Sequence, residues 1–224
     1  MVFTLSTRVA RHLMEFVKQE ELRPGDQVPS EVQIGRDLQV SRGSVREAYR
    51  TLAALGILGI ESGRRPRLRL MDPVALGKVF EYALNTAQIS LTHVSETRRA
   101  IEMQSAQLAA RHATEPQRAA LRDLVAQMRS AGSDHERRAA DTAIHSVIAE
   151  AGGNPLNSLL LNALRQSAEA SARNLLDYCL SEGELARVID AHDVVVERIC
   201  AGDSVGAAAA MSYHFDCSNV RFFT

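Results

Sequence analysis

The chain has 224 residues, 46% of them hydrophobic, and a formal net charge of −1. This length allows two domains with sizeable cores, and the lack of an apolar run of transmembrane length excludes a membrane-spanning protein. No signal-peptide pattern opens the sequence, so we expect a cytoplasmic protein. The cysteines Cys179, Cys200 and Cys217 form no CxxC pair and suit a reducing compartment, as small buried apolar residues.

The near-neutral charge hides an asymmetry between two parts of the chain. The first 70 residues carry 12 Lys and Arg against 8 Asp and Glu, whereas the remainder carries 14 against 19. This split predicts one module that faces nucleic acid and a second module that does not.

Three short helices are predicted in the first part. Leu5, Val9, Leu13 and Phe16 recur at helical spacing, and residues 30–33 form a capping box that opens a second helix. Ser41 is a good N-cap for the third helix, whose expected core face is Val45, Ala48, Leu52 and Leu55. Gly56 suits the position after a helix end, where a left-handed conformation is needed.

A basic hairpin is predicted after the third helix. Residues 57–60 resemble a short strand, residues 61–66 a turn, and residues 67–70 alternate like a returning strand. Three helices followed by such a hairpin describe a winged helix-turn-helix.

Two arginines at the start of the third helix suit contact with DNA. Arg42 and Arg46 are four residues apart, so they project together from the helix. Forked guanidiniums match guanine edges or phosphates in a major groove. The alternative is a surface helix with ordinary solvated arginines.

The second part of the chain is predicted to be all helical. Pro73 marks a linker, and capped amphipathic helices follow at about 74–88, 93–112, 115–131, 134–151, 155–179, 182–201 and 204–222. The expected fold is mainly α, an N-terminal winged helix-turn-helix followed by an antiparallel bundle. The expected boundaries are 1–71 for the first domain, 72–78 for the linker and 79–224 for the second domain.

Four residues of the predicted bundle are candidate metal ligands. Asp141 and His145 are four apart on one helix, His192 lies on a later helix and His214 on the last. Three imidazoles and one carboxylate can converge around a divalent transition metal in a bundle core. The alternatives are a surface Asp/His pair and a solvated His192 beside acidic neighbours.

The first part resembles the GntR family of bacterial transcription regulators. The resemblance covers about residues 5–70 and rests on Pro24-Gly25, Pro29-Ser30-Glu31, Val40-Ser41-Arg42, Val45-Arg46-Glu47-Ala48, Leu55-Gly56 and Gly63. It implies that Arg42 and Arg46 contact operator DNA, that Ser41 and Ser44 support phosphate contacts, and that Gly63 sits at the wing tip. Arg64 and Arg65 are expected to add phosphate or minor-groove contacts.

Residues 75–224 resemble the helical FCD ligand-binding domain of the FadR subfamily. Asp141 to His145 resembles its Asp-x-x-aromatic-His motif, with Ile144 in place of the aromatic residue. The resemblance implies that Asp141, His145, His192 and His214 bind a divalent metal, zinc in the first instance, with nickel or manganese compatible. Arg98 and Glu102 resemble an Arg-x-x-x-Glu pattern whose arginine clamps an effector carboxylate; the alternative is an ion pair within the helix. Asn154 and Arg173 are further cavity candidates.

The sequence therefore predicts a ligand-responsive transcription regulator and not an enzyme. We expect a homodimer that binds a palindromic operator, with repression as the family's commoner mode, and a small carboxylate effector. One alternative is an acyl-CoA-responsive regulator without a functional metal. The other is a metallohydrolase, which the lack of a convincing general base disfavours.

Overall fold

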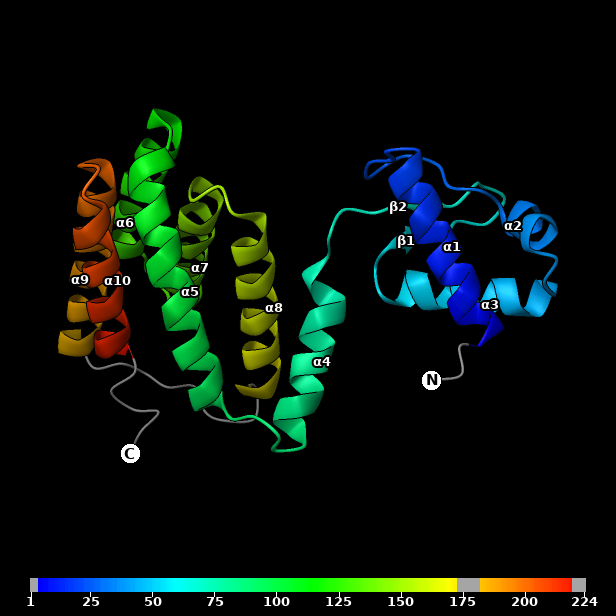
Figure 1. The fold of residues 1–224 in the computed structure, drawn as a ribbon. Helices are drawn as coiled ribbons and strands as arrows, with labels where there is room; N and C mark the ends of the chain where they lie inside the picture. Colours follow the sequence, from blue (N-terminus) through cyan, green and yellow to red (C-terminus); the bar gives the residue numbers. More distant parts are fainter. Residues whose placement is uncertain (1–3, 173–181, 219–224) are drawn as a thin grey trace. The chain divides into compact units, whose positions relative to one another are not determined.

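The computed structural model describes residues 4–172 and 182–218 (Figure 1). The chain divides into two compact units, Met1–Leu76 and Gly77–Thr224. Each unit has its own core and is described by itself.

The first unit contains the three predicted helices: α1 (Leu5–Gln19), α2 (Glu31–Leu38) and α3 (Arg42–Ala54). Each helix begins after a hydroxyl residue whose side chain accepts a backbone N–H of the first turn. These N-caps are Thr4, Ser30 and Ser41. Local capping chemistry therefore sets the starts of all three helices.

The core of the first unit lies between the three helices and the wing. It contains Val9, Leu13, Val28, Ile34, Val45, Ala48, Tyr49, Leu52, Leu58 and Leu68. The prediction for Leu55 was wrong: its side chain is 57% exposed, because it forms the C-cap of α3 after the last helical turn. Gly56 takes the left-handed conformation there, with φ +73°.

The wing is a two-stranded antiparallel hairpin, shorter than the sequence suggested. Strand β1 (Leu58–Gly59) pairs with β2 (Arg67–Leu68), Leu58 opposite Leu68 and Gly59 opposite Arg67. An isolated bridge joins Gln27 to Arg67, so the segment before α2 supports the hairpin.

The second unit is a helical bundle. Its helices are α4 (Pro73–Asn85), which crosses the unit boundary, α5 (Leu91–His112), α6 (Glu115–Ser130), α7 (Asp134–Ala151), α8 (Pro155–Ala172), α9 (Glu182–Cys200) and α10 (Ser204–Ser218). Helix α5 is central, because it contacts α7, α8, α9 and α10 (Figure 1). Alanines 106, 109 and 110 on α5 are buried, so their small side chains let neighbouring helices approach closely.

The predicted helices of the bundle all occur, with ends that differ by a few residues. Helix α4 begins at Pro73, so residues 73–78 of the expected linker are helical. The expected ends of α8 and α10, at 179 and 222, lie outside the described residues. Within residues 4–172 and 182–218, every helix is too short or too polar to span a bilayer.

Candidate metal centre and nucleic-acid interface

Three helices of the bundle bring the four predicted metal ligands together. Asp141 and His145 lie one turn apart on α7, His192 on α9 and His214 on α10. A capping box between Ser133 and Glu136 fixes the start of α7. One potential ligand atom from each of the four residues lies within 4.8 Å of the other three.

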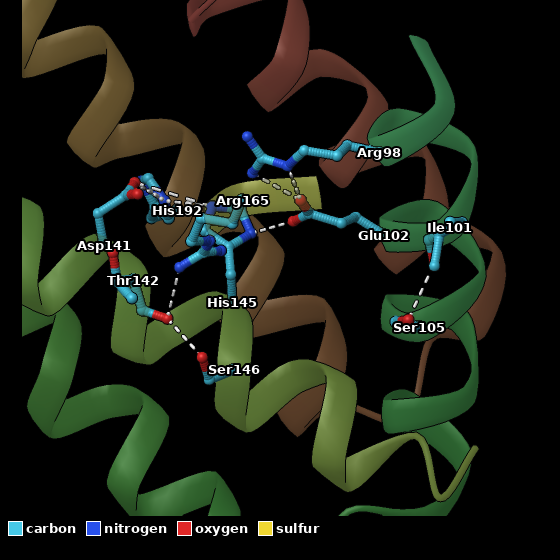
Figure 2. Close-up of polar contacts among 10 residues, drawn as sticks. All are labelled: Arg98, Ile101, Glu102, Ser105, Asp141, Thr142, His145, Ser146, Arg165 and His192. Carbon is cyan, nitrogen blue, oxygen red and sulfur yellow. Dashed lines mark hydrogen bonds and ion pairs between the residues drawn. The ribbon is translucent and has the colours of Figure 1, made fainter. Parts of the chain in front are cut away.

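The closest approaches converge on ring nitrogens and one carboxylate oxygen. Asp141 Oδ1 lies 3.1 Å from His192 Nε2 and 3.7 Å from His145 Nε2. The two imidazole Nε2 atoms are 3.4 Å apart, and the His192 and His214 ring centroids are 4.1 Å apart. Figure 2 shows Asp141 and His145 on α7 meeting His192.

The three imidazoles are deeply buried, whereas the carboxylate is partly exposed. His145, His192 and His214 are 3%, 1% and 4% exposed. The Asp141 side chain is 37% exposed. Asp141 is therefore the most exposed of the four side chains.

Polar contacts on the far side of two rings turn Nε2 into the cluster. His192 Nδ1 lies 2.8 Å from the carbonyl oxygen of Val188, which can only accept, so Nδ1 carries a proton and Nε2 faces the cluster. His145 Nδ1 meets Glu102 Oε2, which implies the same tautomer. The Nε2 atoms of both rings therefore face the cluster, where a metal would replace any proton that they carry.

The electrostatics of the cluster favour a cation. Burial raises the pKa of Asp141, but the hydrogen bond from His192 and the attraction of the neighbouring histidines in their protonated forms outweigh it and hold that pKa well below its usual range. Burial, with His192 and His145 nearby, lowers the pKa of His214 well below its usual value. An ionised carboxylate and a neutral imidazole are the forms that bind metal.

The donor set fits a divalent transition metal. Neutral imidazole nitrogen suits zinc, nickel and copper, and one carboxylate adds charge compensation. The clustering of three buried rings around one carboxylate supports this fit independently of any motif.

The predicted effector residues have different roles in the structure. Arg98 donates to Glu102 Oε1 from Nε at 3.1 Å and from Nη2 at 2.7 Å, which is the ion pair within α5. Glu102 is only 2% exposed and also contacts His145. Asn154 caps α8, its Oδ1 accepting the N–H of Leu156 at 3.1 Å. Arg173 lies outside the described residues.

Two contacts near the centre were not predicted from the sequence. Arg165 on α8 donates from Nη1 to the carbonyl oxygen of Thr142 at 3.0 Å, beside Asp141 (Figure 2). The contact between Glu102 and His145 joins α5 to α7. No spacing within one helix indicates such contacts, because they depend on how helices pack.

The start of α3 presents the predicted DNA-contacting side chains. Ser41 Oγ accepts the backbone N–H of Ser44 at 3.2 Å and lies 3.0 Å from Ser44 Oγ. Arg42 and Arg46 are exposed. Arg46 Nε lies 3.7 Å from Glu31 Oε2, a long distance for an ion pair. Such a weak solvated pair leaves Arg46 able to turn toward another anion.

The wing places its arginines on an exposed turn. Gly63 has φ +74°, which a residue with a side chain rarely adopts. Arg64 pairs with Glu61 at 2.6 Å in an exposed contact. Arg65 is exposed and enters no ion pair with any residue in the described parts of the chain. Arg65 therefore presents uncompensated positive charge near the wing tip.

Comparisons with known proteins match both units. The model "Bacterial regulatory proteins, gntR family" matches residues 5–67, and the FCD domain matches residues 93–216. HTH-type transcriptional regulator LutR of Bacillus subtilis (strain 168) is 28% identical over 201 residues, which cover 88% of this chain and 92% of LutR. HTH-type transcriptional repressor NanR of Escherichia coli (strain K12) is 28% identical over 220 residues, which cover 95% of this chain and 82% of NanR.

Solved structures support the fold. Streptococcus agalactiae GntR superposes with a TM-score of 0.69 at 23% identity, covering 95% of this chain and 98% of that one. E. coli McbR/YncC superposes with a TM-score of 0.54 at 17% identity, covering 100% of this chain and 98% of that one.

Proposed function

The chain belongs to the gntR family of bacterial regulatory proteins and carries an FCD domain, and we propose that a divalent metal and a small organic acid together control its binding to DNA. It is a transcription regulator with a DNA-binding first unit and a ligand-binding second unit, not an enzyme. The metal, the effector class and the operator geometry are the proposed steps.

The proposed metal ligands are Asp141, His145, His192 and His214. The observation that carries this proposal is the convergence of three nearly buried imidazoles on one carboxylate. When bound, the metal supplies a Lewis-acidic centre that attracts oxygen donors. Zinc is the first candidate, and nickel and manganese remain compatible with these donors.

The proposed effector is a small organic acid that reaches the centre past the exposed side of Asp141. Four protein ligands leave open positions on a five- or six-coordinate ion, and a carboxylate with an adjacent oxygen can fill them. Arg98, which is 24% exposed, balances residual negative charge. Asn154 and Arg173 remain proposed effector contacts, and Arg173 lies outside the described residues.

The proposed DNA contacts are Ser41, Arg42, Ser44 and Arg46 on α3, with Gly63, Arg64 and Arg65 in the wing. One winged unit reads few base pairs, so we propose a two-fold homodimer on a palindromic operator. Repression is the proposed mode, in line with the relative NanR, which is named a transcriptional repressor.

The metal centre offers a physical route for coupling. Its ligands come from α7, α9 and α10, so binding ties three helices to one point and favours one packing of the bundle. If effector and operator prefer different states of the protein, each changes the affinity of the other by the same factor. The control of DNA binding then needs no direct contact between the two ligands.

A thermal-shift screen of small carboxylates, with and without prior chelation, tests this function. A hit that disappears on chelation and in His145→Ala, but persists in His135→Ala, supports a metal-mediated organic-acid sensor; His135 is an exposed histidine on the same helix. A hit that survives chelation contradicts the metal-mediated step. A response to acyl-CoA alone contradicts the proposed effector class.

A further inference from the structure

Glu102 occupies an unusual position for a charged residue in a helical core. Its side chain is 2% exposed. Oε1 accepts two hydrogen bonds from Arg98, at 3.1 and 2.7 Å, and Oε2 meets His145 Nδ1 (Figure 2). Both oxygens of one buried carboxylate are therefore engaged, one by a guanidinium and the other by a candidate metal ligand.

We propose that Glu102 is a positioning residue that fixes the His145 ring and its tautomer for metal binding, while Arg98 holds Glu102 in place. This inference rests on the metal centre proposed above and replaces the effector contact expected for Glu102 from the sequence. Glu102 itself does not touch the ion, because the nitrogen facing it is the one turned away from the cluster.

The chemistry of imidazole explains why such a partner matters. A neutral ring carries one proton, and only the other nitrogen can donate a lone pair to a metal. A carboxylate at Nδ1 keeps the proton there, leaves Nε2 free to bind, and makes the ring a stronger donor. His192 receives similar help from a neutral acceptor, the Val188 carbonyl, whereas the acceptor beside His145 is charged.

A purely structural ion pair between Arg98 and Glu102 makes a different prediction. That pair is complete within α5 through Oε1 alone. The contact of Oε2 with α7 then contributes only packing, and its loss leaves the His145 tautomer unchanged. A measurement of which His145 ring nitrogen carries the proton distinguishes the two interpretations.

The test is Glu102→Gln in the full-length protein. A glutamine has one acceptor oxygen, which cannot serve both Arg98 and His145. The charged guanidinium is the stronger competitor for it, so the amide N–H₂ turns toward His145 Nδ1 and the ring proton moves to Nε2. In the metal-free protein, ¹⁵N NMR of the imidazoles should show His145 protonated at Nδ1 in the wild type and at Nε2 in the variant.

The affinity for zinc is the second measurement. Competition with a chromophoric chelator for zinc should show a loss of about 10- to 100-fold in Glu102→Gln. Asp216→Asn is the matched control: it also removes a carboxylate that pairs with an arginine of α5, Arg99, at 2.7 Å, but in an exposed contact. Its zinc affinity should remain that of the wild type. If Glu102→Gln does not fold, Arg98→Lys, which weakens the hold on Glu102 but keeps a cation, should show a smaller loss.

The outcomes separate this inference from the proposed function. Wild-type affinity and an unchanged His145 tautomer in folded Glu102→Gln, or unchanged zinc affinity in Arg98→Lys, overturn the positioning role and leave the metal centre intact. A wild-type protein that binds no zinc, nickel or manganese overturns the metal centre. An equal loss of affinity in Asp216→Asn also overturns the inference, because the effect is then not specific to His145.

Discussion

Chelation should destabilise the second unit and leave the first unit unchanged. All four proposed ligands lie in Gly77–Thr224. A metal held at about 100 times its dissociation constant stabilises the native state by about 2.7 kcal/mol. For a domain of this size, 1 kcal/mol corresponds to roughly 2–4 °C in Tm, so removal of the ion should lower the Tm of the bundle by about 5–11 °C.

Differential scanning calorimetry with and without a chelator measures this shift, and added zinc should reverse it. His192→Ala should melt at the same temperature with and without the chelator, since a ligand is already missing, whereas His135→Ala should respond like the wild type. The reasoning would be refuted if the chelator left the Tm of the bundle unchanged. It would also be refuted if the chelator lowered the Tm of the His192→Ala variant as much as that of the wild type.

Three substitutions test other parts of the molecule. Arg46→Ala should weaken operator binding by about 1–3 kcal/mol, as measured by fluorescence anisotropy at several salt concentrations; undiminished binding contradicts its assignment to DNA. Tyr49→Phe removes a buried hydrogen bond of 2.6 Å to the Pro29 carbonyl and should cost the first unit about 1–3 kcal/mol in chemical unfolding. Ile144→Ala truncates a side chain that is 0% exposed and should cost the bundle about 2–5 kcal/mol, with an unchanged unfolding midpoint as the contrary result.

Local features of the sequence were sufficient to predict most of the fold. Ser30 and Ser41 cap helices because their hydroxyls reach N–H groups three residues away, which depends on nothing outside the first turn. Leu55 shows where periodicity fails, because a position that fits the helical repeat lies beyond the last helical turn.

The site could be predicted in part from the sequence. The spacing of Asp141 and His145 places them on one helical face, but it does not place His192 and His214 beside them; only the resemblance did so. The spacing of Arg98 and Glu102 also allowed an ion pair within one helix, and the structure contains that ion pair. The second contact of Glu102 depends on how α5 packs against α7, and helix periodicity carries no information about that packing.

Burial of the Asp141, His145, His192 and His214 cluster costs folding free energy, and this cost is informative about function. Burying ionisable groups in a bundle core is unfavourable unless each is paired, and apolar residues of similar volume often stabilise such positions more. Here three imidazoles are nearly buried around one carboxylate, and burial lowers the pKa of His214 well below its usual value. Packing alone would be served better by leucine or phenylalanine at these positions. A ligand that binds the native state offsets the cost when it is present, and the stability of the bundle then depends on that ligand, which is the property a sensor requires.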